Sequence, residues 1–280
     1  TDTGYAEIVS VFKDQPAYKA GLKTGDLIIA VNKKSTMNME LQEVVSEIKK
    51  KENKKVVLTI YRDKKSKDYT VKKSSVQLDT VSYKMKEKKI GYIAVSQFLE
   101  NTGDQFDKAV TALEKKGMKS LIIDLRDNGG GLLNTCTQMV SRVIDKDKLI
   151  VYTKDKEGNK EEFKSDSGKT LEIPIIILVN GNTASASEIM TGCLKDYGKA
   201  TVVGTTTYGK GIVQNIMPLT DGSAIKFTIA KYYTPNGTDI HKKGIKPDVK
   251  VKMSDAQWKK AQTDEKADKQ LKKAIELLEK

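Results

Sequence analysis

Arginine, histidine and cysteine are scarce in this chain of 280 residues. Only three of its 50 basic residues are arginines, His241 is the single histidine, and Cys136 and Cys193 are the only cysteines. A Ser-His-Asp triad is nearly excluded, because His241 would be its sole base and lies in a polar loop, GTDIHKKG, that is typical of the protein surface. The cysteines follow no metal-ligand spacing, so we expect free buried thiols and neither a metal nor another cofactor.

Long apolar runs and basic stripes are also missing. No apolar run approaches the ~18 residues of a membrane-spanning helix, so we expect no transmembrane span in this chain. The formal net charge is +13, which could suggest nucleic acid. The lysines are scattered, however, and no aromatic residues interleave with them, so we expect no nucleic-acid partner. The excess charge is interpreted as a solvated surface that favours anionic surroundings.

Hydrophobic patterning predicts a mixed α/β chain. Residues 1–77 alternate strands with one amphipathic helix near 41–50. Between residues 78 and 250, strands and helices alternate, which indicates an α/β core with crossover connections. The expected strands lie near 91–96, 121–125, 173–180 and 200–204, the expected helices near 102–116, 132–144 and 185–197, and a β-rich stretch at 212–233. Residues 251–280 end in an amphipathic helix that either docks on the core or supports a homo-oligomer.

Residues 180–214 carry the most informative pattern, NGNTASASEIMTGCLKDYGKATVVGTTTYGKGIVQ. An apolar run ends in a Gly/Asn turn, and a helix of small residues opens at Ser185. A serine at such a turn exposes its hydroxyl, and the free N–H groups of the first helical turn can stabilise an oxyanion. Lys210, between two glycines, can approach that hydroxyl and act as its base. The pattern indicates a Ser/Lys hydrolase site.

The same residues also have structural interpretations. Ser185-Ala-Ser-Glu188 fits a capping box, in which the serine satisfies a helix N-terminus and Glu188 reaches back. Lys210 is one of 47 lysines and could be a solvated side chain, with glycines that shape a turn. Ser187 is the nearest rival nucleophile, but it lies about 200° around the helix from Ser185.

A second pattern, LIIDLRDNGGG at residues 121–131, combines a buried strand with three glycines. Backbone N–H groups of such a turn can converge on one point and form half of an oxyanion hole. The run lacks the G-K-[ST] ending of a P-loop and the G-x-G-x-x-G spacing, so nucleotide binding is not expected. Arg126 is expected to hold this loop through bidentate hydrogen bonds.

These motifs resemble the C-terminal processing peptidases, also called tail-specific proteases. The similarity rests on TASASEI and VVGTTTYGKGIVQ, on a PDZ-like stretch at 15–32, and on blocks at 91–106, 119–133 and 221–249. It implies a PDZ-like domain at 1–77 that lacks its Gly-rich carboxylate-binding loop. It also implies an α/β serine protease core at 78–250, with crossover βαβ layers similar to the crotonase type, and a helical tail at 251–280.

The resemblance also implies roles for individual residues. Ser185 is expected to be the nucleophile, Lys210 the general base and Gln214 the residue that orients the lysine. The expected oxyanion hole combines the N–H of Ala186 with that of Gly131, which we favour, or of its neighbour Gly130. A general base must be neutral, whereas free lysine titrates near ~10.4, so we expect burial to favour neutral Lys210.

The geometry between Lys210 and Gln214 stays open in the sequence. If KGIVQ forms a turn, the two residues meet as an i,i+4 pair, and the amide oxygen can accept a lysine N–H. If the segment is extended, they lie about 13 Å apart and the contact fails.

The expected activity is cleavage of proteins or peptides near unfolded C-terminal tails, in the cell envelope or after secretion, and both points rest on the resemblance. Gating by the PDZ-like domain is part of this expectation. Arg62, at the end of the strand VVLTIYR, is the candidate contact, because its planar fork can bridge two acceptors. Two alternatives remain: a PDZ-bearing scaffold with an inactive protease domain, and an acyl-transfer enzyme of the crotonase type.

Overall fold

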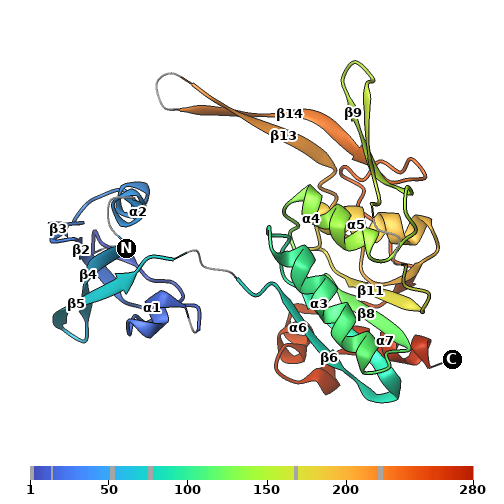
Figure 1. Ribbon diagram of the computed structural model, residues 1–280, viewed down its shortest axis with the longest axis horizontal. Coiled ribbons are helices and arrows are strands. Elements are labelled where there is room, and N and C mark those ends of the chain that lie inside the picture. Colours follow the sequence, from blue (N-terminus) through green and yellow to red (C-terminus); the bar gives the residue numbers. More distant parts are fainter. Residues whose placement is uncertain are drawn as a thin grey trace. The chain divides into compact units, whose positions relative to one another are not determined.

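The chain divides after residue 78 into two separate units, which span residues 1–78 and 79–280 of the computed structural model (Figure 1). The structure describes residues 3–13, 15–50, 54–74, 78–166, 170–219 and 223–279. The boundary expected after residue 77 lies one residue before this division. The tail expected as a separate part, 251–280, belongs to the second unit.

The first unit is an antiparallel sheet covered by short helices. Its sheet order is β1-β2-β4-β5, with β3 paired to β2. Val31, Val44, Leu58 and Ile60 form the centre of its core, each with at most 5% of its surface exposed. The elements are β1 Ala6–Glu7, α1 Pro16–Lys19, β2 Leu27–Val31, β3 Lys34–Ser35, α2 Leu41–Lys49, β4 Lys55–Arg62 and β5 Lys65–Lys72.

The second unit is built on a six-stranded sheet of order β15-β12-β11-β8-β7-β6. Its strands pair in parallel from β15 to β7, and β6 is antiparallel to β7. The strands are β6 Val81–Met85, β7 Ile90–Val95, β8 Ser120–Asp124, β11 Ile175–Val179, β12 Ala200–Gly204 and β15 Val249–Lys250. The helical elements are η1 Glu87–Lys89, α3 Thr102–Lys115, α4 Leu133–Ser141, α5 Ala186–Asp196, α6 Asp255–Ala261, η2 Glu265–Ala267 and α7 Lys269–Leu278.

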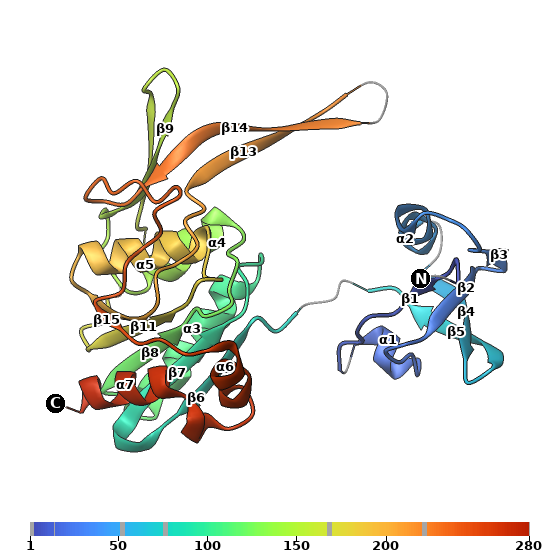
Figure 2. The ribbon, with the colours of Figure 1, turned by 180° about the vertical axis from the view of Figure 1, so that it is seen from behind.

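Both faces of this sheet are covered, which explains its continuous apolar strands. Leu121 and Ile123 pack in the cluster beneath α3, α4 and α5. Ile122, between them, points to the other face and packs with Leu271 and Ala274 of α7. Figures 1 and 2 show the two helical layers from opposite sides. The C-terminal helix therefore docks on the core. Among the described residues, no helix is long and apolar enough to cross a membrane.

A second, antiparallel sheet of order β10-β9-β14-β13 borders the α/β layers. Its strands are β9 Leu149–Asp155, β10 Lys160–Lys164, β13 Ile212–Pro218 and β14 Ala224–Tyr233. β13 and β14 form a long hairpin that extends away from the helices of this unit (Figure 1). The expected β-rich stretch at 212–233 thus contains two strands joined by residues that include 220–222, which lie outside the described residues.

Candidate active site

Ser185 lies in the turn between β11 and α5, where its backbone has φ 58° and ψ −120°. Residues other than glycine rarely adopt a positive φ, because the side chain then crowds the backbone. This backbone strain persists only where surrounding contacts impose the conformation. Thr183 provides two of these contacts. Its hydroxyl donates to Leu125 O at 2.8 Å and accepts the Asn180 N–H at 3.0 Å. The turn is thereby held at the carboxyl ends of the central strands, with Ser185 half-buried.

The glycine loop after β8 lies directly against this turn. A Cβ atom on Gly130 would lie 2.8 Å from Ala186 N and 2.9 Å from the Ser185 Cβ, so only glycine fits. Asn128, which is fully buried, ties the loop in place. Its Nδ2 donates to Val95 O and its Oδ1 accepts the Gly130 N–H, both at 2.8 Å. Asn128 O also accepts the Ala184 N–H at 3.0 Å.

Two backbone N–H groups beside Ser185 have no acceptor among the described residues, those of Gly131 and Ala186. Gly130 differs, because its N–H is already bonded to Asn128 Oδ1. The Ala186 N–H is the first of α5, so the positive end of the helix dipole adds to it. The Gly131 and Ala186 N–H groups are therefore free to donate, whereas the Gly130 N–H is occupied and Gly130 packs against the turn that carries Ser185.

Glu188 connects the turn that carries Ser185, termed here the serine turn, to the loop at residues 207–211 that carries Lys210, termed here the lysine loop. Its carboxylate is fully buried and accepts the backbone N–H of Ser185 at 2.9 Å, of Gly209 at 2.7 Å and of Lys210 at 2.8 Å. The Thr207 hydroxyl donates to the same group at 2.5 Å. Sequence reasoning treated Glu188 only as a capping residue. Its S-x-x-E spacing was the available signal, but the partners 19 to 22 residues away could not be deduced from it.

The backbone of Lys210 is held on both sides, while its side chain is exposed. Lys242 N–H donates to Gly209 O at 2.8 Å, and Tyr232 N–H donates to Gly211 O at 2.9 Å. In the part of the chain that the structure describes, the Lys210 Nζ makes no hydrogen bond or ion pair. The apolar burial expected around this ammonium is thus not present in the described arrangement.

Gln214 lies in β13, so the segment from Lys210 to Gln214 is extended rather than a turn. Gln214 pairs with Thr228 of β14, next to a bulge between Val213 and Gln214. Its side chain is exposed, and no hydrogen bond joins it to Lys210 among the described residues. Of the two geometries left open by the sequence, the structure adopts the extended one.

The two rival catalytic residues differ in position. Ser187 is fully buried, and its hydroxyl donates to Asn128 O at 3.0 Å, so it is not accessible to a substrate. His241 lies beside the lysine loop, because its backbone nitrogen would be 2.5 Å from a Cβ on Gly211. Its own N–H donates to Asp239 Oδ1 at 2.9 Å, and its Nδ1 is buried without a partner among the described residues.

Arg126 anchors the C-terminal segment to the loop that follows β8. Its guanidinium bonds both oxygens of Asp124, with Nε 2.9 Å from Oδ1, and reaches Asp268 at 2.8 Å and Gln270 at 3.1 Å. Trp258 stacks over it, 4.4 Å from guanidinium carbon to ring centroid. The bidentate structural role expected for Arg126 is confirmed, and the structure adds that it binds the tail.

Arg62 uses its planar fork inside the first unit. Its Nε and Nη2 donate to the two Asp26 oxygens at 2.5 and 2.6 Å, and Nη2 also donates to Gly21 O at 2.9 Å. Burial raises the pKa of Asp26, but the Arg62 hydrogen bonds and the Lys23 N–H outweigh it and lower the pKa overall. Asp26 is only 1% exposed, so removal of Arg62 would leave a buried carboxylate without its counter-ion.

Both cysteines are free and buried, as expected. The Cys136 thiol donates to Ala186 O at 3.2 Å, below the start of α5. Burial raises the pKa of Cys136 to about 12, and burial likewise raises the pKa of Cys193. Neutral thiols at these positions act as packing groups. The described residues contain no group of three metal-ligating side chains.

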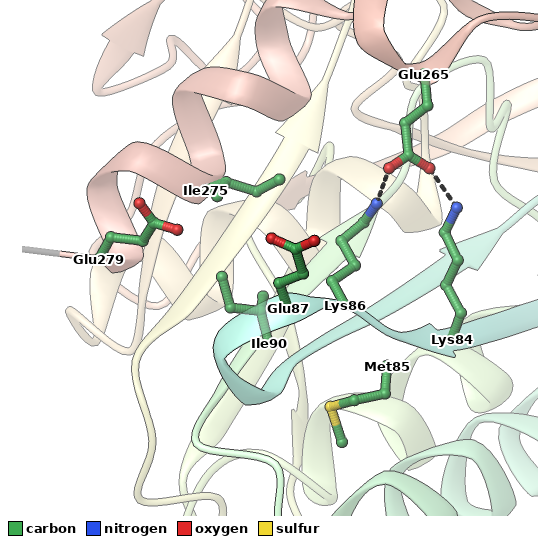
Figure 3. A pocket seen from close by; sticks show the side chains of 8 residues that line it. All are labelled: Lys84, Met85, Lys86, Glu87, Ile90, Glu265, Ile275 and Glu279. Atoms are coloured by element: carbon green, nitrogen blue, oxygen red, sulfur yellow. Dashed lines mark hydrogen bonds and ion pairs between the residues drawn. The ribbon is translucent and has the colours of Figure 1, made fainter.

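A separate pocket of about 420 Å³ lies between β6 and the C-terminal helices (Figure 3). Lys84 and Lys86 both bond to the Glu265 carboxylate, which ties β6 to η2. Glu87, Glu279, Met85, Ile90 and Ile275 complete its lining. None of the proposed catalytic residues belongs to this pocket, in which Lys84 and Lys86 pair with Glu265.

Comparisons with known proteins agree with this architecture. The model of peptidase family S41 matches residues 89–251, and the PDZ domain model matches residues 7–62. The carboxy-terminal processing protease CtpA of Bacillus subtilis is 42% identical over 249 residues, which is 89% of this chain and 53% of that protein. The chain thus spans about half the length of the curated relatives it matches.

Solved structures show the same fold. The photosystem II D1 C-terminal processing protease has a TM-score of 0.58 and 28% identity, over 89% of this chain and 68% of that one. An S41-type chain from Bacteroides fragilis has a TM-score of 0.61 over the whole of this chain and 79% of its own, although only 19% of the residues are identical. This chain therefore belongs to peptidase family S41, a family of serine-type peptidases, and carries a PDZ domain ahead of its peptidase region.

Proposed function

We propose that this chain is the peptidase part of a serine endopeptidase that cleaves proteins near their C-terminal ends. The observation that carries this is the Glu188 carboxylate, which binds the backbones of Ser185 and Lys210 together. Two N–H groups that have no acceptor in the described part of the chain, those of Gly131 and Ala186, lie beside the serine. A nucleophile, a base and an oxyanion hole are the parts that acyl transfer requires.

In the proposed reaction, Ser185 Oγ attacks the scissile carbonyl carbon while Lys210 Nζ accepts the hydroxyl proton. The Gly131 and Ala186 N–H groups stabilise the negative oxygen of the tetrahedral intermediate. The C–N bond then breaks, and Lys210 returns the proton to the leaving amine. Water, activated in turn by Lys210, hydrolyses the acyl-enzyme and regenerates Ser185.

Catalysis by Lys210 requires a change from the described arrangement. Its exposed ammonium has to lose water contact, because desolvation favours the neutral amine. Gln214 suits the role of partner, since its amide oxygen accepts an N–H without adding a negative charge. We propose that an unfolded substrate tail brings this change about and that the PDZ domain gates it, with Arg62 as the candidate contact.

The proposed substrates are proteins with unfolded, accessible C-terminal tails, and the proposed location is the cell envelope or the extracellular space. The relatives' names support the substrate class, since they describe carboxy-terminal processing. The inactive-scaffold alternative predicts the same fold without turnover. The crotonase-type alternative is less well supported, because the family match is to peptidases.

The decisive experiment combines cleavage of an unfolded protein bearing an apolar tail with fluorophosphonate labelling, localised by mass spectrometry. Label on Ser185, and loss of both signals in Ser185→Ala, would support the nucleophile. Lys210→Ala should abolish turnover, whereas Lys243→Ala, an exposed lysine of the neighbouring loop, should retain it. Turnover that survives Lys210→Ala but not His241→Ala would refute the Ser/Lys assignment, and a fold without any turnover would favour the scaffold.

A further inference from the structure

The β13–β14 hairpin contains a long section with two strands only. β14 pairs with β13 along residues 224–231, but it pairs with β9 only at residues 230–233. In the described chain, residues 224–229 of β14 therefore have β13 as their one neighbouring strand. An isolated two-stranded ribbon is marginally stable in water. Figure 1 shows this section projecting from the second unit.

One face of this ribbon is apolar. The register pairs Met217 with Ile225, and alternation places Phe227 and Ile229 on the same face as Ile225. Leu219 continues the row of Met217. These five side chains, termed here the apolar face, are 39–46% exposed. On the opposite face, β14 contributes Ala224, Lys226 and Thr228. Such a large exposed apolar row marks an interaction surface.

Strand β13 leads from the apolar face to the candidate active site. β13 begins at Ile212, two residues after Lys210, and it is one of the two edge strands of its sheet among the described residues. An edge strand presents unpaired N–H and C=O groups that can pair with another chain. At about 3.3 Å per residue, Met217 lies roughly 23 Å along the strand from Lys210. A chain paired along β13 would therefore run to the lysine loop and to Ser185.

We propose that the β13 edge and the apolar face bind the unfolded polypeptide of the substrate as an added strand that leads to Ser185. This inference rests on the proposed function and names a binding surface for it. Main-chain hydrogen bonds would supply affinity without sequence preference, and alternate apolar side chains of the substrate would pack on the apolar face. The surface therefore fits an extended, apolar-rich peptide. Beyond the scissile bond this peptide needs at least about seven residues, the span from Lys210 to Met217.

The test measures binding and cleavage separately. In a Ser185→Ala background, anisotropy of a labelled, permanently unfolded apolar polypeptide reports binding without turnover. The double variant Ile225→Ser/Phe227→Ser should weaken its Kd at least about tenfold. The matched variant Lys226→Ser/Thr228→Ser, on the opposite face of the same strand, should leave it unchanged. In the active protein, the first variant should raise KM for the long substrate and leave a peptide with three residues on each side of the cleaved bond unaffected.

A second measurement needs no protein variant. N-methylation of alternate amides in the labelled peptide removes donors along one edge and should weaken binding to the wild-type hairpin. Equal Kd values for both double variants and for methylated peptide would overturn the proposal. So would a change from dimer to monomer by light scattering in Ile225→Ser/Phe227→Ser without a change in peptide Kd, because the apolar face would then join two copies. Face-dependent binding without any cleavage would retain the surface and refute the proposed peptidase activity instead.

Discussion

Glu188 Oε2 lies 2.8 Å from the backbone nitrogen of Lys210. The same oxygen accepts the Ser185 N–H, so one buried carboxylate sets the separation of the two segments that carry the proposed chemistry. Four donors surround this group and no lysine or arginine pairs with it among the described residues. Its role is therefore positional, because it contacts backbones rather than the reacting atoms.

Glu188→Gln should lower kcat at least about tenfold and lower the melting temperature. The amide replaces an acceptor with an NH₂ group that faces backbone donors, and a buried donor left without an acceptor costs about 1–3 kcal/mol. Peptidase assays and thermal denaturation would check this. Glu172→Gln, which alters a carboxylate that is 75% exposed, is the matched control. Wild-type kcat in Glu188→Gln would show that the two turns keep their spacing without it.

Asn128→Ala should reduce kcat with little change in KM. The side chain holds the Gly130 peptide through its Oδ1 and the end of β7 through its Nδ2, so its loss should misalign the adjacent Gly131 N–H. Oxyanion donors act mainly in the transition state, and loss of one costs up to about 10²–10³ in kcat. Steady-state kinetics separate the two constants. An increase confined to KM would assign Asn128 to substrate binding instead.

Arg126→Met should destabilise the second unit by about 3–5 kcal/mol, because it leaves Asp124 and Asp268 buried without a counter-ion. Urea unfolding followed by Trp258 fluorescence would measure this, since the indole stacks on the guanidinium. Arg142→Met breaks ion pairs with the exposed carboxylates of Asp107 and Glu114. That variant should cost at most about 1 kcal/mol. Equal losses of unfolding free energy in Arg126→Met and Arg142→Met would contradict the anchoring role of Arg126.

Acid should destabilise the PDZ domain through Asp26. The folded-state pKa of this carboxyl lies below its ordinary value of 3.8, so its stabilising contribution is complete above that value and is lost as the pH falls through the lowered pKa. Amide exchange in β2 and β4, measured from pH 6 to pH 2.5, should show this loss. Asp26→Asn should have lower stability at pH 6 and a flatter pH dependence. If stability depends on pH as steeply in Asp26→Asn as in the wild type, other carboxyl groups are responsible for the acid destabilisation.

The positions of the elements could largely be predicted from local patterns. The helix expected at 185–197 is found at Ala186–Asp196, and the strand expected at 200–204 is found at Ala200–Gly204. Burial on both faces makes these strands continuously apolar, and a serine with a capping glutamate marks the helix start, so neighbouring residues suffice for both. The bidentate role of Arg126 in its own loop was expected from its rarity in the chain, but its partners in the tail, Asp268 and Gln270, were not.

The sequence alone was sufficient to recognise the family and the order of Ser185, Lys210 and Gln214, because these depend on residue identity and spacing. Tertiary structure determined how the residues meet. Pairing with β14 extends β13 and separates Gln214 from Lys210, since ladder hydrogen bonds and not local preference set that conformation. Parallel pairing of β11 with β12 brings the segments after these strands together, so that Glu188 binds residues 19 to 22 positions away. Such contacts arise from strand neighbours, which no local sequence pattern specifies.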